Sequence, residues 1–163
     1  NTSERRTMTT RDQHYWLFKT EPESYSWDDL VKDGVSEWDG VRNFQARAYL
    51  RDEINEGDRV LIYHSGSKAK AIVGTAVVVR GGYPDSTAWD PNSDHPDPKS
   101  TPENPVWFMV DIRADAPLAR EVTLEEMKAV PALADMFLIT RPRLSVQPVD
   151  VEAWELITQM GAG

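Results

Sequence analysis

The chain has 163 residues and a formal net charge of −9, from 18 Lys and Arg against 27 Asp and Glu. This length fits one compact domain, and the negative charge argues against a protein that holds nucleic acid by bulk neutralisation of phosphates. Cysteine is absent, so no disulfide, thiolate metal site or cysteine nucleophile is expected. The absence of cysteine suits a reducing compartment, so we expect a cytoplasmic location, or a nuclear one in a eukaryote. The apolar runs are far shorter than the roughly 18 residues that span a bilayer, so no membrane insertion is expected.

Residues 1–13 are polar and show no apolar periodicity, so we expect a disordered tail or an expression remnant there, followed by a single domain over 14–163. Strands are predicted where β-branched and aromatic residues gather between turn residues, over 15–19, 58–64, 71–80, 106–112 and 144–149. Short helices are predicted where a capping side chain precedes an apolar stripe, at Ser26, Asn43, Thr123 and Asp150.

Two interruptions stand out in this pattern. Gly74 lies inside a β-rich run, which predicts a bulge or a close backbone approach. Residues 84–105 hold six prolines and five carboxylates against one lysine, which predicts a long surface loop. About five or six strands with short helices, in no regular alternation, predict an α+β fold with a small curved sheet or barrel.

Several cofactor and metal motifs are missing. The chain has no glycine-rich phosphate loop and no dinucleotide fingerprint, so no nucleotide cofactor is expected. Asp90–Asp94 resembles the opening of a calcium loop, but His95 and Thr101 stand where glycine and glutamate are needed. We therefore expect a solvated acidic loop and no metal site.

His64 and Ser65 are adjacent at the end of a predicted strand and permit two interpretations. With Asp58 or Asp85 as a third member they would form a hydrolase site, although no nucleophile-elbow motif surrounds the serine. Alternatively, His64 faces the same side as its apolar strand neighbours and is a hydrogen-bonded core residue.

The segment Trp38–Asn43 combines a Trp, a turn and the start of a helix with Arg42 beside it. A helix start with a nearby cation suits an anion, and an indole offers a face on which a base stacks. The alternative is that Trp38 belongs to the core and Asn43 is only a cap. Arg143 likewise permits two interpretations: it binds a phosphate, or it pairs with one of the many acidic side chains of the chain.

Taken together, a series of motifs resembles the EVE domain family. The resemblance covers about residues 15–160 in order, and its motifs lie at 16–22, 26–30, 38–47, 57–58, 63–65, 72–74, 83–85 and 143–149. It implies a PUA-like pseudo-β-barrel flanked by short helices, related to YTH domains. It also implies recognition of a modified base of DNA or RNA in an aromatic pocket, without catalysis.

The resemblance further implies where the ligand-binding residues lie. It places Lys19, Thr20 and Trp38 in the pocket wall, His64 and Ser65 on its far side, Arg143 and Ser145 on a basic, polar rim, Trp27, Asn43 and Tyr83 nearby, Asp85 with Tyr83 at the mouth, and Arg42 against adjacent phosphates.

The charge of the chain restricts its expected partners. Weak, salt-sensitive binding to long nucleic acid is expected, so the ligand is a short oligonucleotide or one that a partner protein delivers. Two further hypotheses remain: a small-molecule or nucleoside hydrolase at His64 and Ser65, and a protein-interaction module whose acidic loop docks basic partners. The sequence predicts no oligomeric state.

Overall fold

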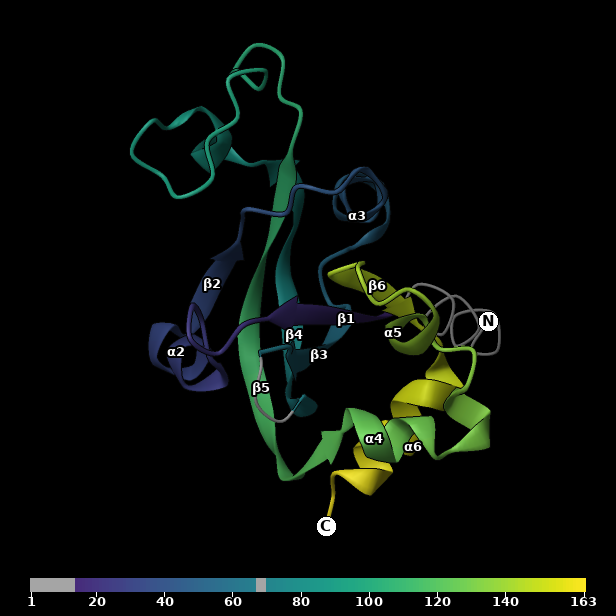
Figure 1. Cartoon of the computed structure of the whole chain (residues 1–163). Helices are drawn as coiled ribbons and strands as arrows, with labels where there is room; N and C mark the ends of the chain where they lie inside the picture. Colours follow the sequence, from purple (N-terminus) through teal and green to yellow (C-terminus); the bar gives the residue numbers. More distant parts are fainter. Residues whose placement is uncertain (1–13, 67–69) are drawn as a thin grey trace, which may run out of the picture.

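The structure is a computed structural model that describes residues 14–66 and 70–163 (Figure 1). The predicted tail, residues 1–13, lies outside the described residues. The strands are β1 (Tyr15–Thr20), β2 (Val35–Trp38), β3 (Arg59–His64), β4 (Ala71–Pro84), β5 (Phe108–Thr123) and β6 (Val146–Val149). The helices are α2 (Trp27–Asp33), α3 (Phe44–Ala48), the π-helix η1 (Tyr49–Glu53), the 3-10 turns η2 (Ser86–Trp89) and η3 (Pro131–Leu133), α4 (Leu124–Lys128), α5 (Phe137–Thr140) and α6 (Val151–Met160).

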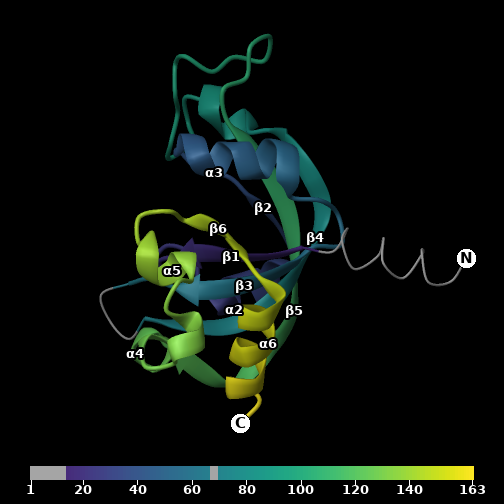
Figure 2. The same cartoon turned by 90° about the vertical axis from the view of Figure 1, so that its right-hand side faces the viewer.

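The six strands form one mixed sheet in the order β2-β5-β4-β3-β1-β6. β1 runs parallel to β3, and every other neighbouring pair is antiparallel. The long β4 and β5 arch along one side of the molecule, and the shorter β1, β3 and β6 cross them (Figures 1 and 2). The α+β class is confirmed, and the sheet stays open because β2 and β6 do not pair.

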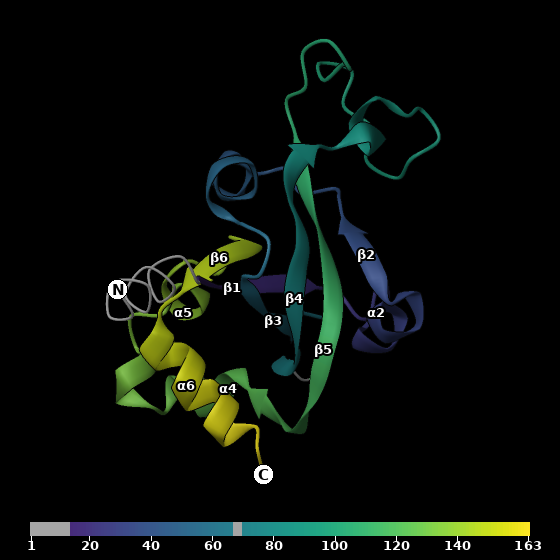
Figure 3. The same ribbon diagram turned by 180° about the vertical axis from the view of Figure 1, so that it is seen from behind.

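Each face of the sheet covers its own hydrophobic core. Alternation along β3 sends Val60 and Ile62 into one core, which α2, α3 and η1 complete, and Leu61 and Tyr63 into the other. The second core is closed by α4, α5 and α6, of which α5 lies beside β1 and β6 and the other two lie below these strands (Figures 2 and 3). Among the helices of the described segments, none is long and apolar enough to cross a membrane.

The predicted helix starts are all confirmed by cap hydrogen bonds. Ser26 and Thr123 each open a capping box, and Asn43 and Asp150 each accept a backbone N–H from the first turn. The sequence predicts these helix starts because each cap residue and the groups it bonds lie within four residues of one another.

The predicted bulge at Gly74 is confirmed, whereas the group that approaches Gly74 closely is a side chain and not a backbone. The register between β4 and β5 shifts between Ile72 and Gly74, and a Cβ at Gly74 would lie 2.6 Å from the ring of Trp27. The missing side chain therefore lets α2 press its indole onto the sheet.

The sequence missed β2 and underestimated β4 and β5. β2 is largely exposed, with only Trp38 buried, and the distal parts of β4 and β5 alternate between exposed and half-buried residues. Strands at the edge or tip of a sheet bury little apolar surface, so their sequences lack the pattern by which a strand is predicted.

Candidate functional site

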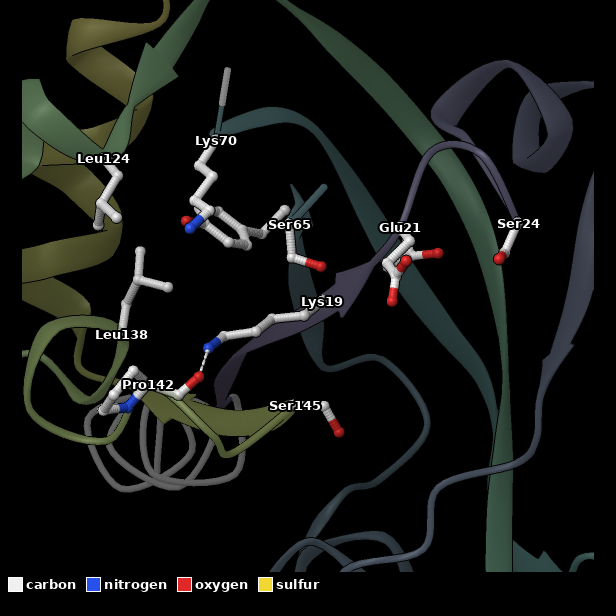
Figure 4. Close-up of a pocket in the computed structure, with 11 residues that line it drawn as sticks. Lys19, Glu21, Ser24, Ser65, Lys70, Leu124, Leu138, Pro142 and Ser145 are labelled. Atoms are coloured by element: carbon white, nitrogen blue, oxygen red, sulfur yellow. Dashed lines mark hydrogen bonds between the residues drawn. The ribbon is translucent and has the colours of Figure 1, made fainter. Parts of the chain in front are cut away.

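Three hollows surround the end of β1 and the segment that leads into β6. The Trp38 hollow, of about 460 Å³, is lined by Lys19, Thr20, Ser24, Tyr25, Ser36, Glu37, Trp38, Asp39, Gly40, Val41, Arg42, Asp94, His95 and Ser145. The lysine hollow, of about 480 Å³, is lined by Lys19, Thr20, Glu21, Ser24, Tyr63, Ser65, Lys70, Leu124, Leu138, Pro142 and Ser145 (Figure 4). The arginine hollow, of about 360 Å³, is lined by Asn43, Gln45, Arg141, Pro142, Arg143 and Leu144.

Trp38 joins the core to the Trp38 hollow. Its ring packs against Phe18 at a centroid distance of 5.4 Å and against the edge of Tyr25 at 6.0 Å, and the residue is 8% exposed. The last residue of β2 is held there by its register with Val110 on β5. The indole is therefore held firmly in place, and Trp38 belongs both to the hydrophobic core and to the lining of the hollow.

The proline-rich loop forms another wall of the same hollow. Gly40 has a φ of +76°, and a Cβ there would lie 2.8 Å from the ring of His95. Arg42 donates to the His95 carbonyl at 2.8 Å, and its guanidinium lies 5.5 Å from the Trp107 ring. The predicted surface loop is thus fastened to the turn after Trp38, and it brings Asp94 and His95 to the hollow.

Asp85 holds the turn after Trp38 and the proline-rich loop together through hydrogen bonds. Its carboxylate accepts from the Gly40 N–H at 2.9 Å, from Arg42 at 3.0 Å and from the Thr87 N–H at 2.9 Å. Burial acts to raise its pKa, but these hydrogen bonds outweigh burial and lower it. The expected place of Asp85 at the pocket mouth is wrong, because its side chain is fully buried where it meets these donors.

The residues around the Trp38 hollow include a half-buried carboxylate, Asp39, and two buried nitrogen atoms without a hydrogen-bond partner among the described residues, Arg42 Nε and His95 Nε2. Burial raises the pKa of Asp39, although His95 opposes the shift, with the nearest N–O distance between them 3.7 Å. His95 Nε2 is buried and has no hydrogen-bond partner among the described residues. The residues around the hollow thus include the carboxylate of Asp39, the imidazole of His95 and the aromatic ring of Trp38.

The predicted site residues fall into separate groups. Lys19, Thr20, Trp38, Arg42 and Ser145 line the Trp38 hollow. Ser65 lines the lysine hollow, on the other side of the wall that Lys19, Thr20, Ser24 and Ser145 share. Arg143 and Asn43 border the arginine hollow, and the Asn43 side chain also caps α3 by accepting from the Ala46 N–H at 2.9 Å.

Besides Asp85, three predicted residues line none of these hollows. Trp27 packs on Gly74 in the core, and His64 accepts a hydrogen bond from the backbone N–H of Trp27 at 3.1 Å. The Tyr83 hydroxyl donates to Asp111 and lies 3.4 Å from Glu37. Tyr83 therefore contacts two carboxylates of the sheet and does not reach any of the three hollows.

The contacts of His64 bear on the hydrolase hypothesis. Its Nε2 is occupied as an acceptor, and the suggested third members are engaged elsewhere: Asp58 accepts from the indole of Trp16 at 2.9 Å, and Asp85 pairs with Arg42. Within the described residues, His64 and Ser65 therefore form no relay of nucleophile, base and acid.

Sequence reasoning missed several lining residues. Glu37, Asp39, His95 and Lys70 reach the hollows from an exposed strand, a turn, a proline-rich loop and a hairpin loop. The only available signal was for Asp39, which follows Trp38 directly in the chain.

Comparison with known proteins places this geometry in a family. The model of the EVE domain matches residues 14–160. The chain belongs to the EVE domain family. Thymocyte nuclear protein 1 of Homo sapiens is 36% identical over 165 residues, which cover 90% of this chain and 73% of the relative.

Two solved structures resemble this member of the EVE domain family closely. A hypothetical protein from Leishmania major superposes with a TM-score of 0.89 at 46% identity and covers 93% of this chain and 96% of its own. Human THYN1, crystallised in complex with DNA that contains 5-methylcytosine, superposes with a TM-score of 0.88 at 35% identity and covers 93% of this chain and 99% of its own.

Proposed function

We propose that this EVE domain binds DNA that contains a modified base, of the 5-methylcytosine class, and holds that base in the Trp38 hollow. The observation that carries the proposal is the match over almost the whole chain to human THYN1, whose structure holds 5-methylcytosine-containing DNA. The Trp38 hollow, at about 460 Å³, has room for one extruded base.

The side chains of the hollow match the edges of a cytosine. Cytosine presents an exocyclic amine that donates, and carboxylates accept from that amine. Asp39 supplies such an acceptor, and His95 Nε2 is a polar group with no partner among the described residues. Trp38 supplies an aromatic surface, and stacking of a base on an aromatic side chain is worth about 1–3 kcal/mol.

We further propose that the domain binds without catalysis. His64 is engaged at the start of α2, and the carboxylates near it belong to other hydrogen bonds, so the hydrolase hypothesis has no assembled relay to support it. RNA with a modified base and a protein that delivers nucleic acid are the alternative partners under this proposal. The proposed compartment is one that holds nucleic acid, the nucleus in a eukaryote and otherwise the cytoplasm.

The experiment is a titration of the purified chain, followed by Trp fluorescence, with short single-stranded oligonucleotides that differ by one base. The proposal predicts at least about tenfold tighter binding when that base is 5-methylcytosine rather than cytosine, equivalent to about 1.4 kcal/mol. Equal affinities would contradict it. Mass spectrometry of the recovered oligonucleotide is expected to find it unchanged, whereas product that disappears in His64→Gln would favour the hydrolase.

A further inference from the structure

The lysine hollow lies beside the Trp38 hollow, and the proposed base recognition does not use it. It is the largest of the three described hollows, and two lysines project into it (Figure 4). Lys19 reaches it from the end of β1 and Lys70 from the residue before β4, and both point toward the side where Leu124 and Leu138 lie.

Lys19 and Lys70 form no ion pair within residues 14–66 and 70–163. Four arginines do form such pairs, Arg42, Arg51, Arg59 and Arg120, but most other cations of the described residues do not. What distinguishes the two lysines is that both line one hollow, where the positive charge of Lys70 acts on Lys19.

The surroundings of Lys19 disfavour its charged form. Its ammonium donates to the Pro142 carbonyl at 2.5 Å and lies 5.8 Å from the centroid of the Tyr63 ring. Burial lowers the pKa of Lys19, and the positive charge of Lys70 lowers it further. An anion placed between the two ammonium groups would raise the pKa of Lys19 and so oppose the effects of burial and of Lys70.

The other lining groups fit an anion at one end of the hollow. Ser65 also lines the hollow, and a serine hydroxyl is able to donate to a phosphate oxygen. One carboxylate, Glu21, also lines the hollow, but it lies at the other end, toward Ser24 (Figure 4). The cationic end is therefore separated from this acid.

We propose that the lysine hollow binds a phosphate group of the nucleic-acid backbone, next to the nucleotide whose base enters the Trp38 hollow. This inference rests on the proposed function. The two hollows share the wall of Lys19, Thr20, Ser24 and Ser145, so a phosphate at Lys19 and Lys70 lies one wall away from the base. A free phosphate offers the same chemistry, and the experiment separates the two sources.

The test compares Lys70→Gln with Lys32→Gln, an exposed lysine of α2 that lines none of the hollows. Each variant is titrated at several salt concentrations with 5-methylcytosine and cytosine oligonucleotides, with 5-methyl-2′-deoxycytidine, and with inorganic phosphate alone. Lys70→Gln is expected to weaken both oligonucleotides by the same factor, about five- to tenfold at low salt, and to reduce the salt slope by about 1. The nucleoside, which has no phosphate, is expected to bind as it does to the wild type, and Lys70→Arg is expected to preserve oligonucleotide binding.

Other outcomes overturn the inference. An unchanged affinity and salt slope for the oligonucleotides would show that no backbone phosphate lies at Lys70, even if inorganic phosphate binds more weakly to the variant. Weaker binding of the nucleoside would assign Lys70 to the base. If the wild type does not distinguish methylated from unmethylated DNA, the proposed function fails, while the salt slope on unmodified DNA still tests the phosphate site.

Discussion

At the scale of single residues, the clearest constraint is the contact between Gly74 and the Trp27 ring. A β-carbon at Gly74 would lie 2.6 Å from that ring, so Gly74→Ala is expected to destabilise the fold by about 1–3 kcal/mol through overpacking. The matched control is Gly81→Ala on the same strand, where the nearest atom lies at 3.5 Å. Urea unfolding of both variants measures the difference, and equal midpoints would show that the indole moves aside freely.

Asp39 gives the residue-scale test of recognition. Asp39→Asn replaces a carboxylate that accepts from the amine of cytosine, so about tenfold weaker binding of the 5-methylcytosine oligonucleotide is expected. Burial raises the pKa of Asp39, so its carboxylate takes up a proton at a higher pH than an ordinary aspartate does. The wild type is therefore expected to lose affinity at that higher pH as the solution is acidified, and Asp39→Asn is expected to show no such loss. Asp135→Asn, an exposed change outside the hollows, is the control. A variant with wild-type affinity and pH profile would remove Asp39 from the site.

At the scale of elements, α2 depends on the histidine at the end of β3. Nε2 of His64 accepts from the first N–H of α2, which requires a neutral imidazole, and burial lowers the pKa of His64 from 6.5. The unfolded chain therefore takes up this proton at higher pH than the folded chain. The stabilisation from His64 is complete above about pH 6.5 and is lost as the pH falls through the folded pKa.

This dependence is measurable against other titrating groups. Urea midpoints at about pH 7.5 and pH 5 are expected to differ more for the wild type than for His64→Gln, which keeps an acceptor but has no charge to gain. Identical differences would mean that protonation of His64 leaves its bond to α2 intact.

The elements also show what the sequence could predict. Helix starts at Ser26, Asn43, Thr123 and Asp150 were predictable because a cap is a local interaction. β2 was not, because an exposed edge strand has no apolar alternation, and the hollows were not, because Asp39, His95 and Lys70 meet only through tertiary packing. Within the family motifs, Lys19, Thr20 and Trp38 line the Trp38 hollow, whereas Asp85 and Trp27 support the fold and do not line the hollows.

At the scale of the whole molecule, a net charge of −9 surrounds a small group of cations near the end of β1. Binding through about two or three phosphates predicts that affinity for a short single strand falls only about tenfold between 50 and 200 mM salt. Titrations across that range measure it. A fall of a thousandfold or more would indicate a much wider phosphate-binding surface than these hollows provide.

The central claim is that the base enters the Trp38 hollow, and NMR titration with 5-methyl-2′-deoxycytidine tests it most directly. The nucleoside has no phosphate, so the account predicts shifts for the Trp38 indole and for the amides of Asp39 and His95, with the amides of Lys70 and Leu124 unchanged. Shifts confined to Lys70 and Leu124, or no shifts at all, would contradict it.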